Sequence, residues 1–230
     1  MKLLISLLGS AALLAGCASQ PNYTPKAKAD KSSKFAVGLG VGTTGGTVEG
    51  KYAPNNTVAL RGNFNFLNFS VDEEFDDIDY EGDFDATTFG GFVDLAPFQN
   101  GFILSGGAFI GDKTLDLDAT PTTNVEIGGQ VFSPTEVGTL TGQAELNSFA
   151  PYAGIGYDGF IAGSSDWSFN ARAGVMFTGS PEVDLISANG TLSNNPLLRQ
   201  ELEAEIAAIE EEADDYKYYP VLSIGVARRF

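Results

Sequence analysis

The 230-residue chain contains no histidine and a single cysteine, Cys17. Without histidine it cannot form a Ser-His or Asp-His dyad or a histidine-based metal site. One cysteine rules out both a disulfide framework and a cysteine-based zinc cluster. These absences remove the common hydrolase and acyltransferase mechanisms. We therefore expect a protein that is not an enzyme and needs no cofactor.

Long apolar runs are also missing beyond the first residues, so no transmembrane helix is predicted in the mature chain. Behind Met1-Lys2, the apolar run 3–14 is typical of a secretory signal peptide. Leu14-Ala15-Gly16-Cys17 resembles a lipobox, which implies a lipid on the Cys17 thiol. The alternative is an ordinary signal peptide that takes Cys17 away with it. We expect residues 1–17 to be the signal peptide and the Pro- and Lys-containing segment 18–34 to be a disordered linker.

Basic residues are scarce: 13 Lys and Arg stand against 30 Asp and Glu, which gives a formal net charge of -17. Such a charge excludes nucleic acid as a natural partner. The acidic residues gather in two stretches, 72–85 and 201–215.

Residues 35–230 are rich in glycine and phenylalanine, with 28 Gly and 17 Phe in the whole chain. They contain segments in which apolar residues alternate with small or polar ones, the period of a β-strand. The turns after the second, fourth and sixth segments are short, and the connections after the third, fifth and seventh are long. This pattern predicts an all-β fold, an eight-stranded antiparallel transmembrane β-barrel. Its strands are expected at 35–42, 47–52, 57–69, a segment ending at 95, 102–113, 149–160, 167–178 and 218–230.

The last strand ends Gly225-Val226-Ala227-Arg228-Arg229-Phe230. This ending resembles the C-terminal recognition strand of bacterial outer-membrane barrels, and the whole pattern resembles small barrels of the OmpA, OmpX and OmpW kind. The resemblance implies an outer-membrane location, with residues 18–34 in the periplasm and 35–230 as the barrel domain. It also implies that Gly225 and Phe230 form a signal for the outer-membrane assembly machinery. The surroundings would be membrane lipids and lipopolysaccharide, and we expect a monomer.

Strand alternation assigns charged residues to the barrel lumen. An eight-stranded barrel is just wide enough for side chains to fill it. Opposite charges inside it should pair, because an unpaired buried ion is costly. The alternatives are a lumen closed by ion pairs and a gated conductive path. The predicted network comprises Glu49, Lys51, Arg61, Asp94, Asp158, Arg172 and Arg229.

The first acidic stretch places carboxylates on one face of a strand. Such a row could hold divalent cations shared with lipopolysaccharide, or it could be a solvated strand extension. The residues concerned are Asp77, Asp79, Glu81, Asp83 and Asp85.

The second acidic stretch predicts an α-helix in the last extracellular loop. Asn195 can cap it, Pro196 suits its first turn, and apolar residues recur at helical spacing from Leu198 to Ala213. At ~1.5 Å per residue the helix is long enough to lie across the barrel mouth, and its apolar stripe is expected to pack on the rim. We expect a structural or surface-interaction protein that works through its acidic extracellular loops. The alternative is a narrow, helix-gated channel for small cationic solutes.

Overall fold

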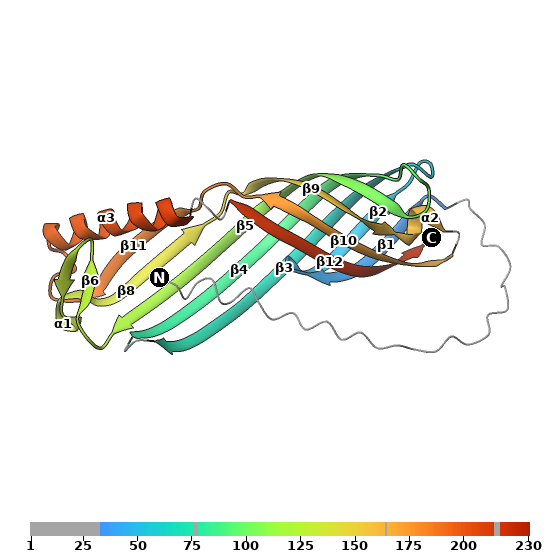
Figure 1. Ribbon diagram of the computed structural model, residues 1–230. Helices are drawn as coiled ribbons and strands as arrows, with labels where there is room; N and C mark the ends of the chain where they lie inside the picture. Colours follow the sequence, from blue (N-terminus) through green and yellow to red (C-terminus); the bar gives the residue numbers. More distant parts are fainter. Residues whose placement is uncertain (1–32, 76–77, 164, 214–216) are drawn as a thin grey trace.

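The computed structural model describes residues 33–75, 78–163, 165–213 and 217–230. Within these ranges, eight strands pair in antiparallel fashion into a closed barrel, since β5 pairs with β9 and β1 with β12 (Figure 1). The predicted eight-stranded antiparallel barrel is confirmed. Its strands are β1 (Phe35–Gly42), β2 (Gly45–Tyr52), β3 (Val58–Phe75), β4 (Ile78–Leu95), β5 (Phe102–Pro121), β9 (Phe149–Asp158), β10 (Trp167–Phe177) and β12 (Tyr218–Arg229).

The alternation of the sequence decides the two surfaces of the barrel. On β10, Trp167 and Phe169 are exposed, whereas Asn170 and Arg172 are buried inside. An apolar outer surface around a polar interior is the arrangement of a transmembrane barrel. Among the described helices, none is both long and apolar enough to cross a membrane. The exposed apolar side chains on the barrel include Phe35, Leu39, Leu60, Phe66, Leu104, Ile155, Val175, Leu222 and Ile224.

Both ends of the described chain lie at the same end of the barrel. The N–H of Phe230 donates to the carbonyl oxygen of Phe35 at 3.1 Å. The connections β2–β3 and β4–β5 at this end are short turns. Outer-membrane barrels place their short turns in the periplasm and their longer connections outside the cell. This end is therefore the periplasmic one.

At the other end the sheet continues far beyond the barrel. β3, β4 and β5 extend past it, β8 (Gly138–Glu145) pairs with the upper part of β5, and β11 (Glu182–Asn189) pairs with β8. We call this part the extension sheet: residues 67–75, 78–86 and 113–121 with β8 and β11. The long connections expected to be acidic loops are therefore largely strands. The third strand, expected at 57–69, continues to Phe75 in the structure.

The polarity of the strands is inverted between the barrel and the extension sheet. On β3, the inward positions are the buried Arg61 and Asn65 inside the barrel, and then Leu67 and Val71 above it. The outward positions change in the opposite sense, from apolar to polar. Lipid contact on β3 therefore ends near Phe66, and the outer face of the extension sheet is exposed to water. These outward residues are Leu60, Phe64 and Phe66, followed by Asn68, Ser70 and Asp72.

The predicted helix is present as α3 (Pro196–Ala213), but it does not lie across the barrel mouth. It runs along the extension sheet (Figure 1). Leu198 and Leu202 are buried there against Ile127 and Val137, with Leu185 of β11 packed on the same cluster. The expected placement on the rim was wrong because the inner face of the extension sheet is itself apolar and offers the helix a partner.

A small cap completes the extension sheet at its far end. The hairpin β6 (Val125–Ile127) and β7 (Gln130–Phe132) leads into the one-turn helix α1 (Pro134–Val137). Glu136 accepts hydrogen bonds from the N–H and Oγ of Ser133 at 2.8 and 2.6 Å. These bonds stabilise the ionised carboxylate and hold the pKa of Glu136 below its usual range. Sequence analysis did not predict this cap.

The inversion of polarity predicts that the same substitution has a large effect at one exposed isoleucine and a small effect at another. Ile155, near the middle of β9, is 53% exposed, and Ile186, on β11, is 59% exposed. We expect Ile155→Lys to lower the free energy of unfolding in lipid vesicles by about 2–4 kcal/mol. Ile186→Lys should change it by less than ~0.5 kcal/mol, as at an ordinary water-exposed position. Urea titration of both variants measures the difference, and equal effects would contradict the inferred membrane boundary.

Candidate functional site: the barrel interior

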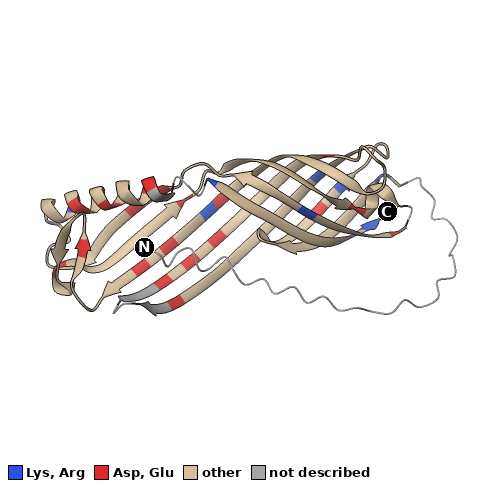
Figure 2. Cartoon of the chain, in the orientation of Figure 1, with Lys and Arg blue, Asp and Glu red and all other residues tan. Residues whose placement is uncertain are grey.

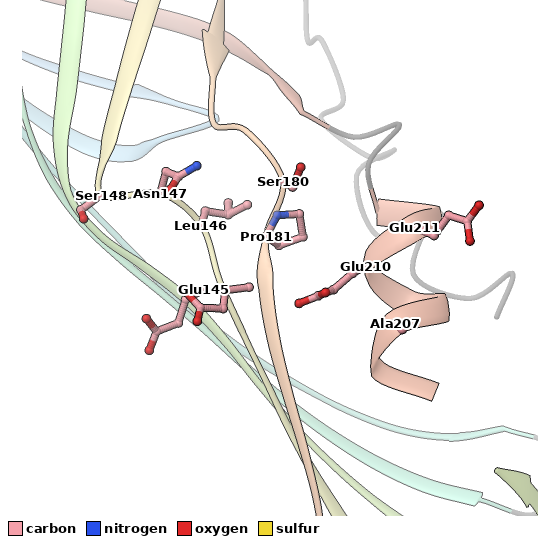
Figure 3. A pocket seen from close by; sticks show the side chains of 10 residues that line it. Glu145, Leu146, Asn147, Ser148, Ser180, Pro181, Ala207, Glu210 and Glu211 are labelled. Atoms are coloured by element: carbon pink, nitrogen blue, oxygen red, sulfur yellow. The ribbon is translucent and has the colours of Figure 1, made fainter. Parts of the chain in front are cut away.

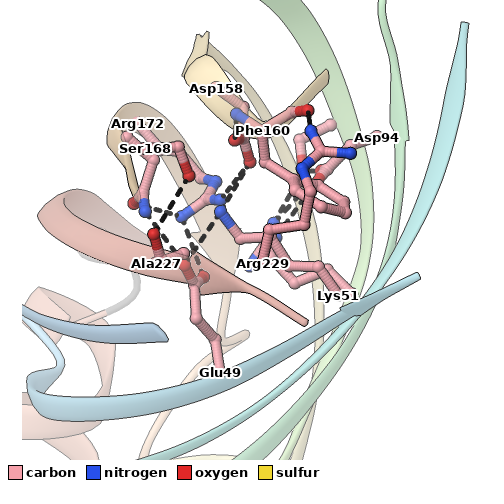
Figure 4. A network of polar contacts seen from close by, with 12 residues as sticks. Glu49, Lys51, Asp94, Asp158, Phe160, Ser168, Arg172, Ala227 and Arg229 are labelled. Carbon is pink, nitrogen blue, oxygen red and sulfur yellow. Dashed lines mark hydrogen bonds and ion pairs between the residues drawn. The ribbon is translucent and has the colours of Figure 1, made fainter. Parts of the chain in front are cut away.

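The centre of the lumen holds a closed ring of ion pairs contributed by β2, β9 and β10 (Figure 4). Lys51 Nζ lies 3.0 Å from Glu49 Oε1 and 2.7 Å from Asp158 Oδ2. Arg172 completes the ring, with Nη2 at 2.9 Å from Asp158 Oδ2 and Nη1 at 3.1 Å from Glu49 Oε2. Asn170 donates to Glu49 Oε1 at 3.0 Å and accepts from Arg172 at 2.8 Å. Two cations and two carboxylates thus neutralise one another.

A second pair lies beside the ring, on β3 and β4, where Arg61 is in register with Lys51 of β2. Arg61 Nε donates to Asp94 Oδ2 at 2.9 Å, and its Nη2 donates to Ser105 Oγ at 2.9 Å. Ser105 in turn donates to Asp94 Oδ1 at 2.6 Å. The guanidinium of Arg61 also stacks on Phe92, 4.0 Å from the ring centroid. Each charged group of this cluster therefore has an ionic or hydrogen-bonding partner.

Burial makes these partners necessary. Glu49, Lys51 and Asp158 are exposed by no more than 4%. Moving such ions out of water costs several kcal/mol each unless their Coulomb and hydrogen-bonding partners replace the water. A balanced ring satisfies that condition, and it leaves no net charge in the lumen to attract a passing ion. The arrangement can fix the strands against one another, and it offers no reactive group.

The periplasmic end of the lumen is filled by the one-turn helix α2 (Gly159–Ala162). Asp158 caps this helix, because its Oδ1 accepts from the N–H of Phe160 at 2.9 Å. Phe160 and Ile161 then turn into the barrel and pack against small residues of other strands, including Ala36 and Ala227. One aspartate therefore serves both the ion-pair ring and the plug beneath it.

Arg229 was predicted to join the lumen network, and the structure places it elsewhere. Its guanidinium donates to the carbonyl oxygens of Ser33, Phe160 and Gly163 at 3.0, 2.6 and 2.9 Å. It also stacks on the ring of Phe160, at 4.4 Å from the centroid. Arg229 is one residue from the end of the chain, so it lies below the ring of ion pairs, where the available acceptors are main-chain carbonyls.

Above the ion pairs the lumen is closed by aromatic side chains. Phe92, Phe109 and Tyr152 meet edge to face, with centroids 5.0 to 5.6 Å apart. Met176 and Val221 complete the buried cluster. The space left between the ion pairs and this cluster is a cavity of about 20 Å³, which is room for roughly one water molecule. The α2 plug, the ion pairs and the aromatic cluster thus follow one another along the described lumen.

The sequence indicated most of the charged residues and little of what surrounds them. Strand parity placed Glu49, Lys51, Arg61, Asp94, Asp158 and Arg172 inside, and the structure brings them into two clusters. Strand parity did not indicate Ser105 or the plug of Phe160 and Ile161. Ser105 shares the inward parity of Ile103 and Phe109, so the same alternation could have found it. The plug has only a weak signal, an Asp-Gly pair at the end of a strand.

The candidate cation site on the acidic strand is only partly described. Asp77 lies outside the described residues, and for Asp79 the backbone alone is described, within β4. Glu81, Asp83 and Asp85 are exposed on the outer face of the extension sheet. Asp83 and Asp85 accept hydrogen bonds from Ser70 and Asn68 on the neighbouring strand. No three acidic side chains in the described part of the chain converge as a metal site would require.

An acidic pocket of about 630 Å³ lies where the extension sheet meets the barrel (Figure 3). The β8–β9 and β10–β11 connections line one side of it, and the last turns of α3 line the other. Glu145 and Glu182 face each other across the β8–β11 ladder, and Glu210 accepts from the N–H of Val183 at 3.2 Å. The surplus of carboxylates gives the pocket a negative potential.

The remaining predicted residues concern processing and assembly. Cys17 lies outside the described residues. Gly225 has a packing role, because a Cβ there would lie 2.7 Å from the carbonyl oxygen of Leu39 and 3.1 Å from Asn170 Oδ1. The ring of Phe230 is 67% exposed at the periplasmic rim.

Closure, an apolar outer surface and a filled polar interior define a small outer-membrane β-barrel, and the protein belongs to the bacterial outer membrane. The fold is similar to that of CarO2 from Acinetobacter baumannii, with a TM-score of 0.56, 24% identity, and coverage of 85% of this chain and 98% of that one. The fold is also similar to that of CarO from the same species, with a TM-score of 0.56, 22% identity, and coverage of 86% of this chain and 98% of that one. At this identity the similarity shows the fold alone. No protein family and no curated protein matches the chain.

The ring of ion pairs predicts that charge balance matters more than any one ion. Arg172→Gln leaves a buried carboxylate uncompensated, and we expect it to lower the free energy of unfolding by about 3–5 kcal/mol. The double variant Arg172→Gln/Asp158→Asn keeps the ring neutral and should recover part of that loss. Urea titration in vesicles, followed by heat-modifiable gel migration, measures both.

A matched control is Arg199→Gln on α3, whose guanidinium bonds only to the side chain of Asn194 among the described residues. It should change stability by less than ~0.5 kcal/mol. A double variant as unstable as the single one would show that hydrogen-bond geometry, and not charge balance, holds the lumen together.

Proposed function

We propose that this protein is a closed, non-enzymatic outer-membrane barrel with a structural or surface-interaction role, exerted through its extracellular extension sheet. The observation that carries the proposal is the filled lumen. The α2 plug, the ion pairs and the aromatic cluster follow one another along the described lumen, and the cavity between the ion pairs and the aromatic cluster is about 20 Å³. A barrel without a path through it acts through its surfaces.

The outer face of the extension sheet is the surface best suited to this role. Its carboxylates stand opposite one another across the strands: Asp72 faces Glu81, Glu81 faces Asp118, and Asp83 faces Asp116. Like charges in directly opposed positions destabilise a sheet. A cationic partner relieves that repulsion, so we propose basic surfaces, or divalent cations shared with lipopolysaccharide, as what this face attracts. The acidic side chains act here as a diffuse field and not as a chelating site.

The barrel interior supports the absence of enzymatic activity. Its buried carboxylates are each neutralised by a cation at 2.7 to 3.1 Å. A general acid or base must be free to exchange a proton with a substrate. In the ion pairs these carboxylates are already engaged by Lys or Arg, and their burial leaves a substrate little access to them.

The acidic pocket beside α3 favours a second function, a narrow helix-gated channel for small cationic solutes. The pocket lies at the outer end of the barrel and would gather cations there. Gating by α3 would require Leu198 and Leu202 to leave a buried apolar cluster. Because such exposure is unfavourable, we rank this function below the first.

Conductance of the refolded full-length chain in a planar bilayer distinguishes the two functions. We expect no discrete conductance steps, because the packed lumen holds no continuous water path. Steps with cation selectivity would overturn the closed-barrel proposal.

Two variants assign any current that does appear. Asp158→Asn changes a lumen charge, and Glu182→Gln changes a charge in the outer pocket. A current through the lumen should change its ion selectivity with Asp158→Asn, whereas an effect of Glu182→Gln alone would assign selectivity to the pocket.

A further inference from the structure

An exposed arginine lies among aromatic rings on the outer surface of the barrel at its periplasmic rim. Arg228 on β12 is in register with Val37 of β1 on one side and with Trp167 of β10 on the other. Its Cζ atom lies 5.9 Å from the Trp167 ring centroid and 5.6 Å from that of Phe230. Trp167 is 64% exposed and Phe230 is 67% exposed. The guanidinium is thus positioned by two rings that themselves face the membrane.

Arg228 differs from the other barrel arginines in its partners. Arg61 and Arg172 are paired with buried carboxylates, and Arg229 donates to carbonyl oxygens. For Arg228, the described residues supply ring contacts and no ion pair. Its N–H groups therefore remain available to an acceptor from outside the protein. A guanidinium is a fork of donors that matches the oxygens of a phosphate.

The depth of the site limits what that acceptor can be. Arg228 is the penultimate residue of β12, which ends at Arg229 on the periplasmic side. An arginine on the lipid-facing surface is tolerated near the membrane interface and is costly at the midplane. Aromatic side chains also gather at interface depth. The anionic groups at that level are lipid phosphates, and at the periplasmic end they belong to the inner leaflet of the outer membrane.

We propose that Arg228, held between Trp167 and Phe230, binds the phosphate of an anionic phospholipid in the periplasmic leaflet, in preference to a zwitterionic one. The distribution of charge agrees with this orientation, because the acidic residues gather on the extension sheet and α3, far from this rim (Figure 2). Two exposed charged residues, Lys34 and Asp166, directly precede Phe35 and Trp167 in the chain. The C-terminal carboxylate of Phe230 lies at the same end of the barrel. The proposal depends on the membrane location and not on the proposed extracellular role.

The chain carries its own probe for this site, because Trp167 is its single tryptophan. The refolded full-length protein is placed in phosphatidylcholine vesicles, and a small fraction of the lipid is replaced by acyl-brominated phosphatidylglycerol or acyl-brominated phosphatidylcholine. Quenching of Trp167 fluorescence gives the relative association of each lipid with this part of the barrel. We expect about a fivefold preference for phosphatidylglycerol over phosphatidylcholine at low salt. This is the ratio expected from the attraction of one cationic side chain to an anionic head group. High salt should reduce it.

Variants test whether Arg228 is the cause. Arg228→Gln should bring the preference close to unity, and Arg228→Lys should keep part of it, because a lysine retains the charge without the fork. The matched control Arg199→Gln removes an exposed arginine on α3 and should keep the full preference. Heat-modifiable gel migration verifies that each variant is folded.

Three results would overturn the proposal. In the wild-type protein, both brominated lipids could quench the Trp167 fluorescence equally, at low and at high salt. Arg228→Gln could retain the preference. The Arg228→Gln variant could also keep the wild-type quenching but be inserted more slowly by the assembly machinery. That result would assign Arg228 to the C-terminal assembly signal. The wild-type salt series decides the first result even without a variant.

Discussion

Within the hydrocarbon of a membrane, every main-chain N–H and C=O group needs a partner inside the protein. β5 meets this requirement by changing its neighbour along its length. Its lower part pairs with β9 as far as Ile110, and its upper part pairs with β8 from Thr114. The change falls at Gly111, whose φ is 139° and where a Cβ would lie 2.2 Å from the carbonyl oxygen of Thr87. Both the closure of the barrel and the existence of the extension sheet depend on this strand.

Closure is also what makes the lumen chemistry possible. Lys51 and Asp158 are 107 residues apart in the chain, and Glu49 and Arg172 are 123 apart. They meet because β2 and β10 lie on either side of the β1–β12 seam. Once brought together, they stabilise the closed state only as a balanced set, since any one of them alone would be a buried ion. The result is a set of ion pairs that joins β2 to β9 and β10 across the lumen.

The protein is polarised along its axis. Within the membrane the outside is apolar and the inside charged, and above it the sense is reversed, with an apolar inner face that accepts α3. Acidic residues collect on the extracellular part (Figure 2). The periplasmic rim combines aromatic rings with Arg228. Each end therefore presents a different chemistry to its surroundings. The proposals made above follow this division, with cations at the extracellular end and anionic head groups at the periplasmic end.

The sequence alone determined the eight strands of the barrel, their inward and outward faces, and the helix from Pro196, because alternation and helical spacing are local properties of a chain. It also placed Glu49, Asp158 and Arg172 on one surface. Only the tertiary structure decided which ions pair, that Arg229 donates to carbonyls below them, and that α3 packs on the extension sheet. Those outcomes depend on distances between strands far apart in the chain and on competition between apolar surfaces. Neither the distances between strands nor this competition can be derived from the periodicity of a single segment.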